Sequence, residues 1–286
     1  MEIKTAGVVG FGIMGSGIAQ VCAQSGYEVI VSARSEEKLN HGLASIDRMM
    51  AKAVEKGKLS QKDRESAMAR IKGIISSTDF SGFSVCDLVI EASTENIDLK
   101  KNIFAGIDKV CPLSTIFATN TSTLSVIGLA AETRRAERVM GMHFFNPVPM
   151  MQLVEIVRTI ATSDETVEVG KRFVKSLGKT GVIARDFPGF IANRLTLPFL
   201  LNAVRMVEAN IATAEDIDTA MRYGNNHPMG PLALLDLIGL DNFLDGVNAM
   251  YEEMKDPQFA PPPLLKGMVA MGWLGRKTRK GFYEYK

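Results

Sequence analysis

The sequence predicts an α/β protein in two parts, a doubly wound, mainly parallel sheet that carries an inserted helical hairpin, and then an all-α region. Three observations lead to this fold class. Short apolar segments alternate with helical patterns over residues 6–184, as in parallel sheets covered by helices. A glycine-rich stretch joins the first predicted strand to the first helix. From Pro188 onward the hydrophobic period is helical throughout.

The elements of the first part follow one another in a regular order. Strand, glycine loop and helix occupy residues 6–26, and a second strand covers 28–32. Two helical patterns, 35–56 and 60–72, are separated by Gly57 and predict the hairpin, because Ser60 begins an N-cap box. The remaining strands are expected at 74–76, 88–92, 116–120, 139–143, 153–157 and 182–184. Helices are expected around residues 99–107 and over 164–177.

The second part consists of helical segments only. Residues 190–209 form a long apolar pattern in which Pro198 predicts a kink. Thr213 caps a helix that ends at Gly224, and Pro231 suits the first turn of a helix over 232–238. Two more helices are expected at 241–254 and 264–271. The predicted domains are therefore 1–185 and 186–286.

Gly10, Gly12 and Gly15 have the spacing G-x-G-x-x-G between an apolar strand and a helix. The first glycine permits a tight turn, the second a close approach to a pyrophosphate, and the third close packing of helix on sheet. The amides of this helix N-terminus, with Ile13 and Met14 in its first turn, would face the phosphates. The context favours a Rossmann-type dinucleotide site over the alternative, a glycine-rich turn.

Composition and charge exclude several functional classes. Among 286 residues, 33 are Lys or Arg and 32 are Asp or Glu, so a net charge of +1 provides no global field for nucleic acid or an acidic membrane. No apolar run reaches the roughly 20 residues of a membrane span. Three scattered cysteines suit neither a disulfide framework nor a metal cluster. Residues 1–4 leave no room for a signal peptide. We expect a soluble, cytoplasmic protein without a metal.

Polar residues follow two predicted strands on the rim where the phosphate loop lies. Asn120 and Ser122 follow one strand, and His143 precedes the turn-forming Asn146-Pro147 after another. A lone histidine is often structural, but on this rim a neutral imidazole could take a proton from an alcohol. Glu155, in an otherwise apolar strand, is the candidate that would fix its tautomer, since a buried acid needs a partner.

At this point the chain resembles the 3-hydroxyacyl-CoA dehydrogenase family, particularly short bacterial 3-hydroxybutyryl-CoA dehydrogenases. The resemblance covers nearly the whole sequence. It rests on residues 10–19, Glu95-Asn96 with Lys100, residues 120–122, 143–149, 153–155, 186–194, 228–236 and 281–283. Blocks in the correct order along the chain are far more specific than a single glycine motif.

The resemblance implies roles for the residues of the site. His143 would be the general acid/base and Glu155 would orient it, while Ser122 and Asn193 would hold the reacting oxygens of the acyl group. Neutral donors suit that task because they stabilise an oxyanion without quenching the base. Asn193 begins the helical region, so the site would close between domains. The alternative for Asn193 is a helix-terminal residue that bonds its own backbone.

Glu95, Lys100 and Asn120 would contact the cofactor by the same resemblance. For Lys100 the alternative is a solvated helix lysine. The hairpin would help to bind CoA, and Lys52 and Lys56 near its tip suit the phosphates, although a solvated charged face is an equal alternative.

The chain departs from the family's pattern in the hairpin and in the tail. Ala51 and Glu55 stand where a hydroxyl and a lysine are expected. Arg279 stands where a glycine is usual, which puts only the local turn geometry in doubt.

The end of the second predicted strand bears on the choice of cofactor. An acid there normally accepts hydrogen bonds from the ribose 2′-hydroxyl and selects NAD. Here Ala33 takes its place, and Arg34 follows with serines on either side of the pair. A guanidinium can bind a 2′-phosphate bidentately. We therefore expect NADP(H) to be preferred, with NAD(H) as the alternative if Glu36 or Glu37 reaches the ribose.

The expected reaction is reversible hydride transfer between the nicotinamide and C3 of an (S)-3-hydroxyacyl-CoA. By resemblance, the substrate pair would be 3-hydroxybutyryl-CoA and acetoacetyl-CoA. Two alternatives are a related dehydrogenase of a sugar acid or free hydroxy acid, and a structural protein that binds a dinucleotide without catalysis. Apolar helices in the second part suggest a homodimer through that domain.

Overall fold

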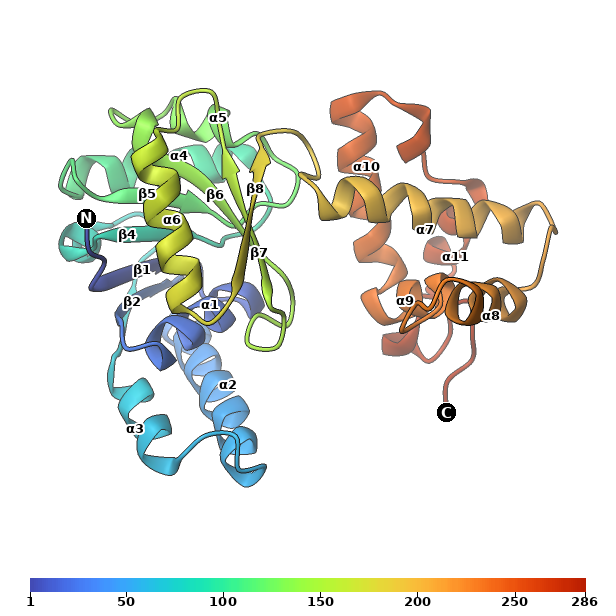
Figure 1. Ribbon diagram of the computed structural model, residues 1–286, viewed down its shortest axis with the longest axis horizontal. Coiled ribbons are helices and arrows are strands. Elements are labelled where there is room, and N and C mark those ends of the chain that lie inside the picture. The colour runs from blue at the N-terminus through green and yellow to red at the C-terminus, as the bar shows by residue number, and fades with distance from the viewer. The chain divides into compact units, whose positions relative to one another are not determined.

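The computed structural model describes all residues from 1 to 286, which divide into two compact units, Met1–Phe187 and Pro188–Lys286 (Figure 1). Neither contains a helix that is both long and apolar enough to cross a membrane.

The first unit is built on one eight-stranded sheet in the order β3-β2-β1-β4-β5-β6-β7-β8. Every neighbouring pair is parallel except β6 with β7, which is antiparallel, so the predicted mainly parallel sheet is confirmed. The strand order changes direction between β1 and β4, where open α/β sheets leave a crevice for ligands. The strands are β1 Thr5–Val9, β2 Glu28–Ala33, β3 Ile71–Ile75, β4 Leu88–Glu91, β5 Ile116–Thr119, β6 Val139–Phe144, β7 Leu153–Arg158 and β8 Thr180–Arg185.

Helices cover both faces of this sheet, as a doubly wound fold requires. On one face, buried residues of α1 and α6 form a single cluster with those of β1, β4, β5 and β6. On the other face, Phe104 of α4 meets Phe117 of β5 edge to face, with the ring centres 6.1 Å apart. The helices are α1 Ile13–Gln24, α4 Ile97–Val110, α5 Val126–Ala130 and α6 Asp164–Ser176.

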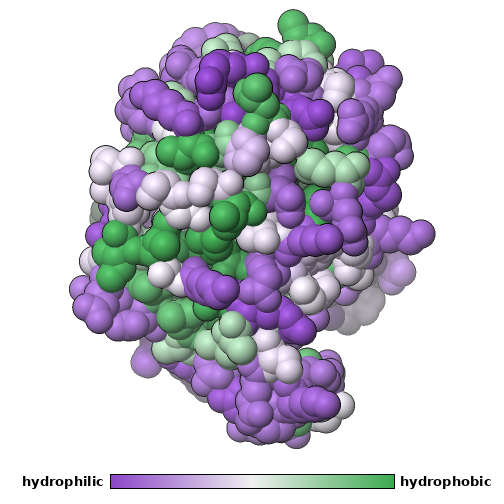
Figure 2. All heavy atoms as spheres, turned by 90° about the vertical axis from the view of Figure 1, so that its left-hand side faces the viewer, coloured by the Kyte–Doolittle hydropathy of each residue, from purple (hydrophilic) through white to green (hydrophobic).

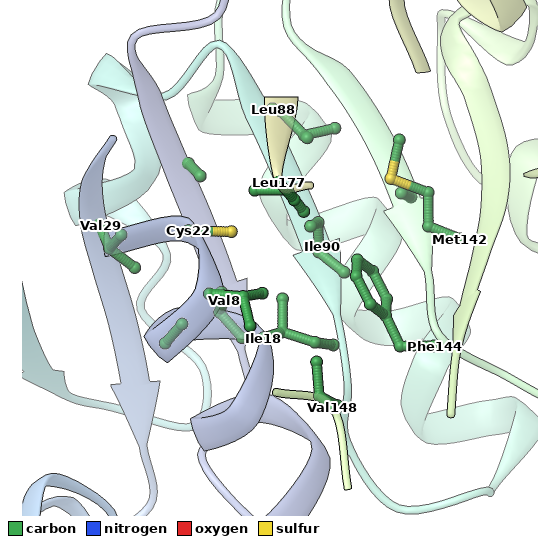
Figure 3. Close-up of a cluster of buried hydrophobic side chains, with 14 of the residues drawn as sticks. Val8, Ile18, Cys22, Val29, Leu88, Ile90, Met142, Phe144, Val148 and Leu177 are labelled. Atoms are coloured by element: carbon green, nitrogen blue, oxygen red, sulfur yellow. The ribbon is translucent and has the colours of Figure 1, made fainter. Parts of the chain in front are cut away.

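Figure 3 shows the core between α1 and the sheet. Ile18 and Cys22 of α1 lie against Val8 of β1 and Ile90 of β4, and none of the four is exposed. Burial of one such aliphatic side chain contributes about 1.5–3 kcal/mol. This packing holds the first turn of α1 close to the carboxyl ends of β1 and β4.

All three cysteines of the chain are buried and unpaired. Burial raises the pKa of the Cys22 and Cys86 thiols to about 12, and that of Cys111 to about 11. These thiols are therefore packing groups, protonated at neutral pH.

The predicted hairpin is present between β2 and β3, as helices α2 Glu36–Glu55 and α3 Gln61–Ala69. Ser35 and Ser60 cap the two helices through their hydroxyls. Arg64 of α3 donates two hydrogen bonds, both 2.8 Å, to the Asp47 carboxylate of α2. Figure 1 shows the hairpin as the lowest part of the first unit, and the bottom of Figure 2 is mostly hydrophilic.

The second unit is helical throughout, as predicted. Its core is one cluster centred on Leu200, Leu235, Val247 and Leu265, all of which are fully buried. Pro198 lies inside α7, and the chain is helical on both sides of it. The helices are α7 Ala192–Glu208, α8 Ala214–Gly224, α9 Pro231–Ile238, α10 Leu240–Met254 and α11 Pro263–Ala270.

Two buried carboxylates attach the C-terminal tail to this unit. Asp236 accepts hydrogen bonds from the amides of Phe282 and Tyr283, and Asp218 accepts one from the Tyr283 hydroxyl. The turn before the tail contains Arg279 at φ +59°. The usual glycine would adopt this left-handed conformation without the strain that a side chain brings.

Candidate active site

The glycine loop between β1 and α1 leaves open space on one side. Gly10 has φ +95°, and a side chain at Gly15 would collide with the carbonyl oxygen of Gly10. A side chain at Gly12 would meet nothing within 4 Å. Helix α1 begins without a side-chain cap, unlike α2 to α6, so the amides of Ile13 and Met14 are left for another acceptor. Open space beside uncapped amides at the positive end of a helix fits a pyrophosphate.

A cavity of about 240 Å³, called here the first cavity, opens beside this loop at the carboxyl ends of β1 to β4. Its wall carries two cations, Arg34 and Lys38, and no carboxylate. Ala33 is buried at the end of β2, so only a methyl group occupies the position of the usual acid. Glu36 and Glu37 lie in the first turn of α2 and do not line the cavity.

A buried ion pair that the sequence analysis missed lies at the end of β4. Glu91 is not exposed and Lys100 is 1% exposed, and the Lys100 ammonium contacts the two Glu91 oxygens at 2.9 and 2.8 Å. Glu91 also accepts hydrogen bonds from the hydroxyls of Ser93 and Thr119. The interpretation of Lys100 as a solvated lysine is therefore wrong. A carboxylate at the end of an apolar strand was the available signal, because burial obliges it to find partners.

Glu95 connects this ion pair to the segment that follows β5. Its Oε2 lies 3.3 Å from the Lys100 ammonium, and its Oε1 accepts hydrogen bonds from the Thr121 hydroxyl and from the Ser122 amide. Asn120 accepts a 2.8 Å hydrogen bond from the backbone of β6. Glu95, in the loop after β4, and the backbone of β6 therefore both hold the segment 120–122 by hydrogen bonds.

His143 and Glu155 face one another across the antiparallel pair β6 and β7. They are directly opposed in the strand register, and His143 Nδ1 lies 2.6 Å from Glu155 Oε2. Glu155 is fully buried and His143 is 6% exposed. The imidazole packs on the ring of Phe145, with the ring centres 4.5 Å apart. A carboxylate at Nδ1 fixes the tautomer in which Nε2 can accept a proton.

The loop after His143 is held by a lysine that the sequence analysis did not single out. Lys179 donates hydrogen bonds of 2.7 Å to the carbonyls of Val148 and Met151. Burial lowers the pKa of the Lys179 ammonium. The loop contains the cis peptide between Asn146 and Pro147 and returns the chain to β7.

A cavity of about 330 Å³, called here the second cavity, brings six of the expected site residues together. No group of His, Cys, Asp and Glu side chains in the chain is arranged to hold a metal ion. The residues predicted for the site that line this cavity are Met14, Glu95, Lys100, Asn120, Ser122 and His143.

Three predicted site residues lie elsewhere in the chain. Asn193 is in the first turn of α7, in the second unit. Lys52 is in the last turn of α2 and Lys56 is its C-cap, and both side chains are exposed. Neither lysine lines the two cavities.

Known proteins are similar to this chain along nearly its whole length. Residues 5–187 match the model of the 3-hydroxyacyl-CoA dehydrogenase NAD binding domain, and residues 189–285 match that of the 3-hydroxyacyl-CoA dehydrogenase C-terminal domain. The chain is 42% identical over 284 residues to a 3-hydroxybutyryl-CoA dehydrogenase of Bradyrhizobium diazoefficiens, covering 99% of this chain and 96% of that protein. It is 44% identical over 285 residues to a probable 3-hydroxybutyryl-CoA dehydrogenase of Bacillus subtilis, covering 100% and 98%.

Among solved structures, that of (S)-3-hydroxybutyryl-CoA dehydrogenase from Ralstonia eutropha superimposes with a TM-score of 0.94 at 44% identity, and all of both chains is covered. The two family models together match nearly every residue, and the two relatives are more than 40% identical over nearly their whole length. These matches confirm the resemblance seen in the sequence. The chain belongs to the 3-hydroxyacyl-CoA dehydrogenase family of nicotinamide-dependent oxidoreductases.

Proposed function

We propose that this protein catalyses reversible hydride transfer between a nicotinamide cofactor and C3 of a short-chain (S)-3-hydroxyacyl-CoA. The substrate is 3-hydroxybutyryl-CoA, after which its relatives are named, and acetoacetyl-CoA is the product of its oxidation at C3. The observation that carries the proposal is the 2.6 Å contact of the buried Glu155 with His143, which lines the second cavity. A histidine oriented by a buried carboxylate beside a dinucleotide loop suits the oxidation of an alcohol.

In the proposed mechanism His143 removes the proton of the substrate hydroxyl as hydride leaves C3, and it returns that proton in the reverse reaction. Glu155 balances the positive charge that the imidazole gains. Ser122 and Asn193 donate hydrogen bonds to the substrate oxygens, which stabilises developing negative charge without a formal cation. The bound nicotinamide supplies the hydride acceptor.

The cofactor would bind through both cavities. The glycine loop, residues 10–15, receives the pyrophosphate on the open side of Gly12. Glu95, Lys100 and Asn120, which line the second cavity with His143, would contact the nicotinamide end. Ala33 and Arg34 at the other end favour NADP(H), because a 2′-phosphate meets a guanidinium there instead of an acid.

The two parts of the chain divide the remaining tasks. We assign dinucleotide binding to residues 1–185, and substrate binding and formation of a homodimer to residues 186–286. The exposed Lys52 and Lys56 suit the phosphates of CoA.

Initial rates test this function directly. Acetoacetyl-CoA reduction is measured separately with NADPH and with NADH, and free acetoacetate is the control substrate. Oxidation of a sugar acid is measured separately with NADP⁺ and NAD⁺. We expect activity with the thioester and a higher kcat/KM with NADPH. Equal rates for free acetoacetate and its CoA thioester contradict the substrate assignment, and a higher kcat/KM with NADH contradicts the cofactor preference.

A paired substitution tests the residues assigned to that preference. Ala33→Asp with Arg34→Ile should shift preference toward NADH, because it restores an acceptor for the ribose and removes the guanidinium. An unchanged ratio of the two kcat/KM values would show that these positions do not select the cofactor.

A further inference from the structure

The wall of the first cavity continues from the end of β2 onto the loop after β3. Both Ser76 and Ser77 of that loop line the cavity together with Arg34 and Lys38. The cofactor preference proposed above uses only residues at the end of β2, so this second segment has no role in it.

Main-chain pairing fixes where Ser76 lies. Strands β2 and β3 are parallel with Ala33 opposite Ile75, and the Ser76 amide donates a 3.0 Å hydrogen bond to the Ala33 carbonyl. Ser76 therefore lies beside the residue that replaces the usual acid. Its Oγ accepts hydrogen bonds from the amides of Thr78 and Asp79, at 3.2 and 2.7 Å. With its oxygen committed to the turn, the hydroxyl can turn its hydrogen toward a ligand as a donor.

Lys38 approaches the same cavity from the first turn of α2. Its backbone amide donates to the Ser35 hydroxyl that caps the helix, so the position of the residue is set by the cap. Neither Lys38 nor Arg34 forms an ion pair within 4 Å with any carboxylate of the chain. Two cations share one cavity wall without a neutralising acid, an arrangement that favours an anion.

The acids near this wall do not line the cavity. Asp79 accepts a 2.9 Å hydrogen bond from the Ser81 amide, which lowers the pKa of the carboxyl group, and it does not line the cavity. Glu36 and Glu37, beside Lys38 in α2, are exposed and also absent from the wall.

We propose that Lys38, from the first turn of α2, and Ser76, from the end of β3, join Arg34 to complete a binding site for the ribose 2′-phosphate of NADP(H). This inference rests on the NADP(H) preference proposed above and adds two specificity-determining residues to it. A 2′-phosphate carries close to two negative charges at neutral pH, and Arg34 alone would balance only one. Lys38 supplies the second positive charge, and the Ser76 hydroxyl donates a hydrogen bond to a phosphate oxygen.

Binding of the reduced cofactors to the full chain, measured by titrating nicotinamide fluorescence, tests this without turnover. Lys38→Ala should weaken NADPH binding by about fivefold, the value of an exposed ion pair, and leave the Kd for NADH unchanged. Lys38→Glu should weaken NADPH binding further. Ser76→Ala should also raise the Kd for NADPH alone, with its melting temperature checked because the hydroxyl supports a turn. Arg48→Ala is the matched control, an exposed cation of the same helix that does not line the cavity.

The outcomes separate this inference from the one on which it rests. If the unaltered chain binds NADH more tightly than NADPH, both are overturned. If it prefers NADPH and loses that preference with Arg34→Ala, but Lys38→Ala and Ser76→Ala leave the Kd for NADPH unchanged, only the present proposal is overturned. Equal weakening of NADH and NADPH by Lys38→Ala would also overturn it, because the contact would not involve the 2′-phosphate.

Discussion

Substitution of Glu91 by glutamine should destabilise the first unit strongly. The Lys100 ammonium, only 1% exposed, would lose the carboxylate whose two oxygens it contacts at 2.9 and 2.8 Å. Removal of one partner from a buried ion pair costs about 3–5 kcal/mol, because a charge is left without compensation. Glu95, 3.3 Å from the same ammonium, would still offset part of that charge. We therefore expect the free energy of unfolding to fall by about 3 kcal/mol, at the lower end of this range.

Two further variants make the measurement specific. Glu91→Gln combined with Lys100→Met removes both charges and should cost less than Glu91→Gln alone. Lys101→Met breaks an exposed contact of 3.5 Å with Glu132 and should change stability by less than about 1 kcal/mol.

Urea unfolding followed by far-ultraviolet circular dichroism reports the secondary structure of both units, so it includes the transition of the first unit. Fluorescence of the single tryptophan, Trp273, reports the second unit and should change little in these variants. The reasoning is refuted if Glu91→Gln remains within about 1 kcal/mol of the unaltered protein, or if the double variant is no more stable than the single one.

Three other outcomes are expected. His143→Gln and Glu155→Gln should each lower kcat for acetoacetyl-CoA by about 10²–10⁴-fold with the fold retained, and near-normal turnover in either variant would remove the proposed mechanism. The three buried thiols should not react with a disulfide reagent at pH 8 until the protein is unfolded, since burial raises their pKa values to about 11 or 12; rapid labelling of the native protein would contradict this. Arg279→Gly should raise the free energy of unfolding by up to about 1 kcal/mol, because glycine relieves the left-handed backbone at φ +59°, and a loss of stability would show that the side chain supports the turn.

The sequence by itself was sufficient wherever the determinant is local. The spacing of Gly10, Gly12 and Gly15 between an apolar strand and a helix states a backbone requirement, which the positive φ of Gly10 and the close approach at Gly15 display directly. The alternation of strands and helices and the helical period after Pro188 predicted the fold class for the same reason, since each pattern spans neighbouring residues. The presence of the hairpin followed from helical periods and from the cap at Ser60.

Only the tertiary structure decided which distant residues share a site. Glu91 and Lys100 meet because helix α4 returns over the end of β4, and Thr119 joins them from the adjacent strand. Ser76 reaches Ala33 through parallel pairing of β2 with β3 across the whole hairpin. His143 and Glu155 were both candidates in the sequence, yet their contact depends on the one antiparallel pair in the sheet and on its register. A shift of one residue would turn one of these side chains to the opposite face. Sequence patterns report which face of its own element a residue occupies, whereas register and partner strand arise from packing between segments far apart in the chain.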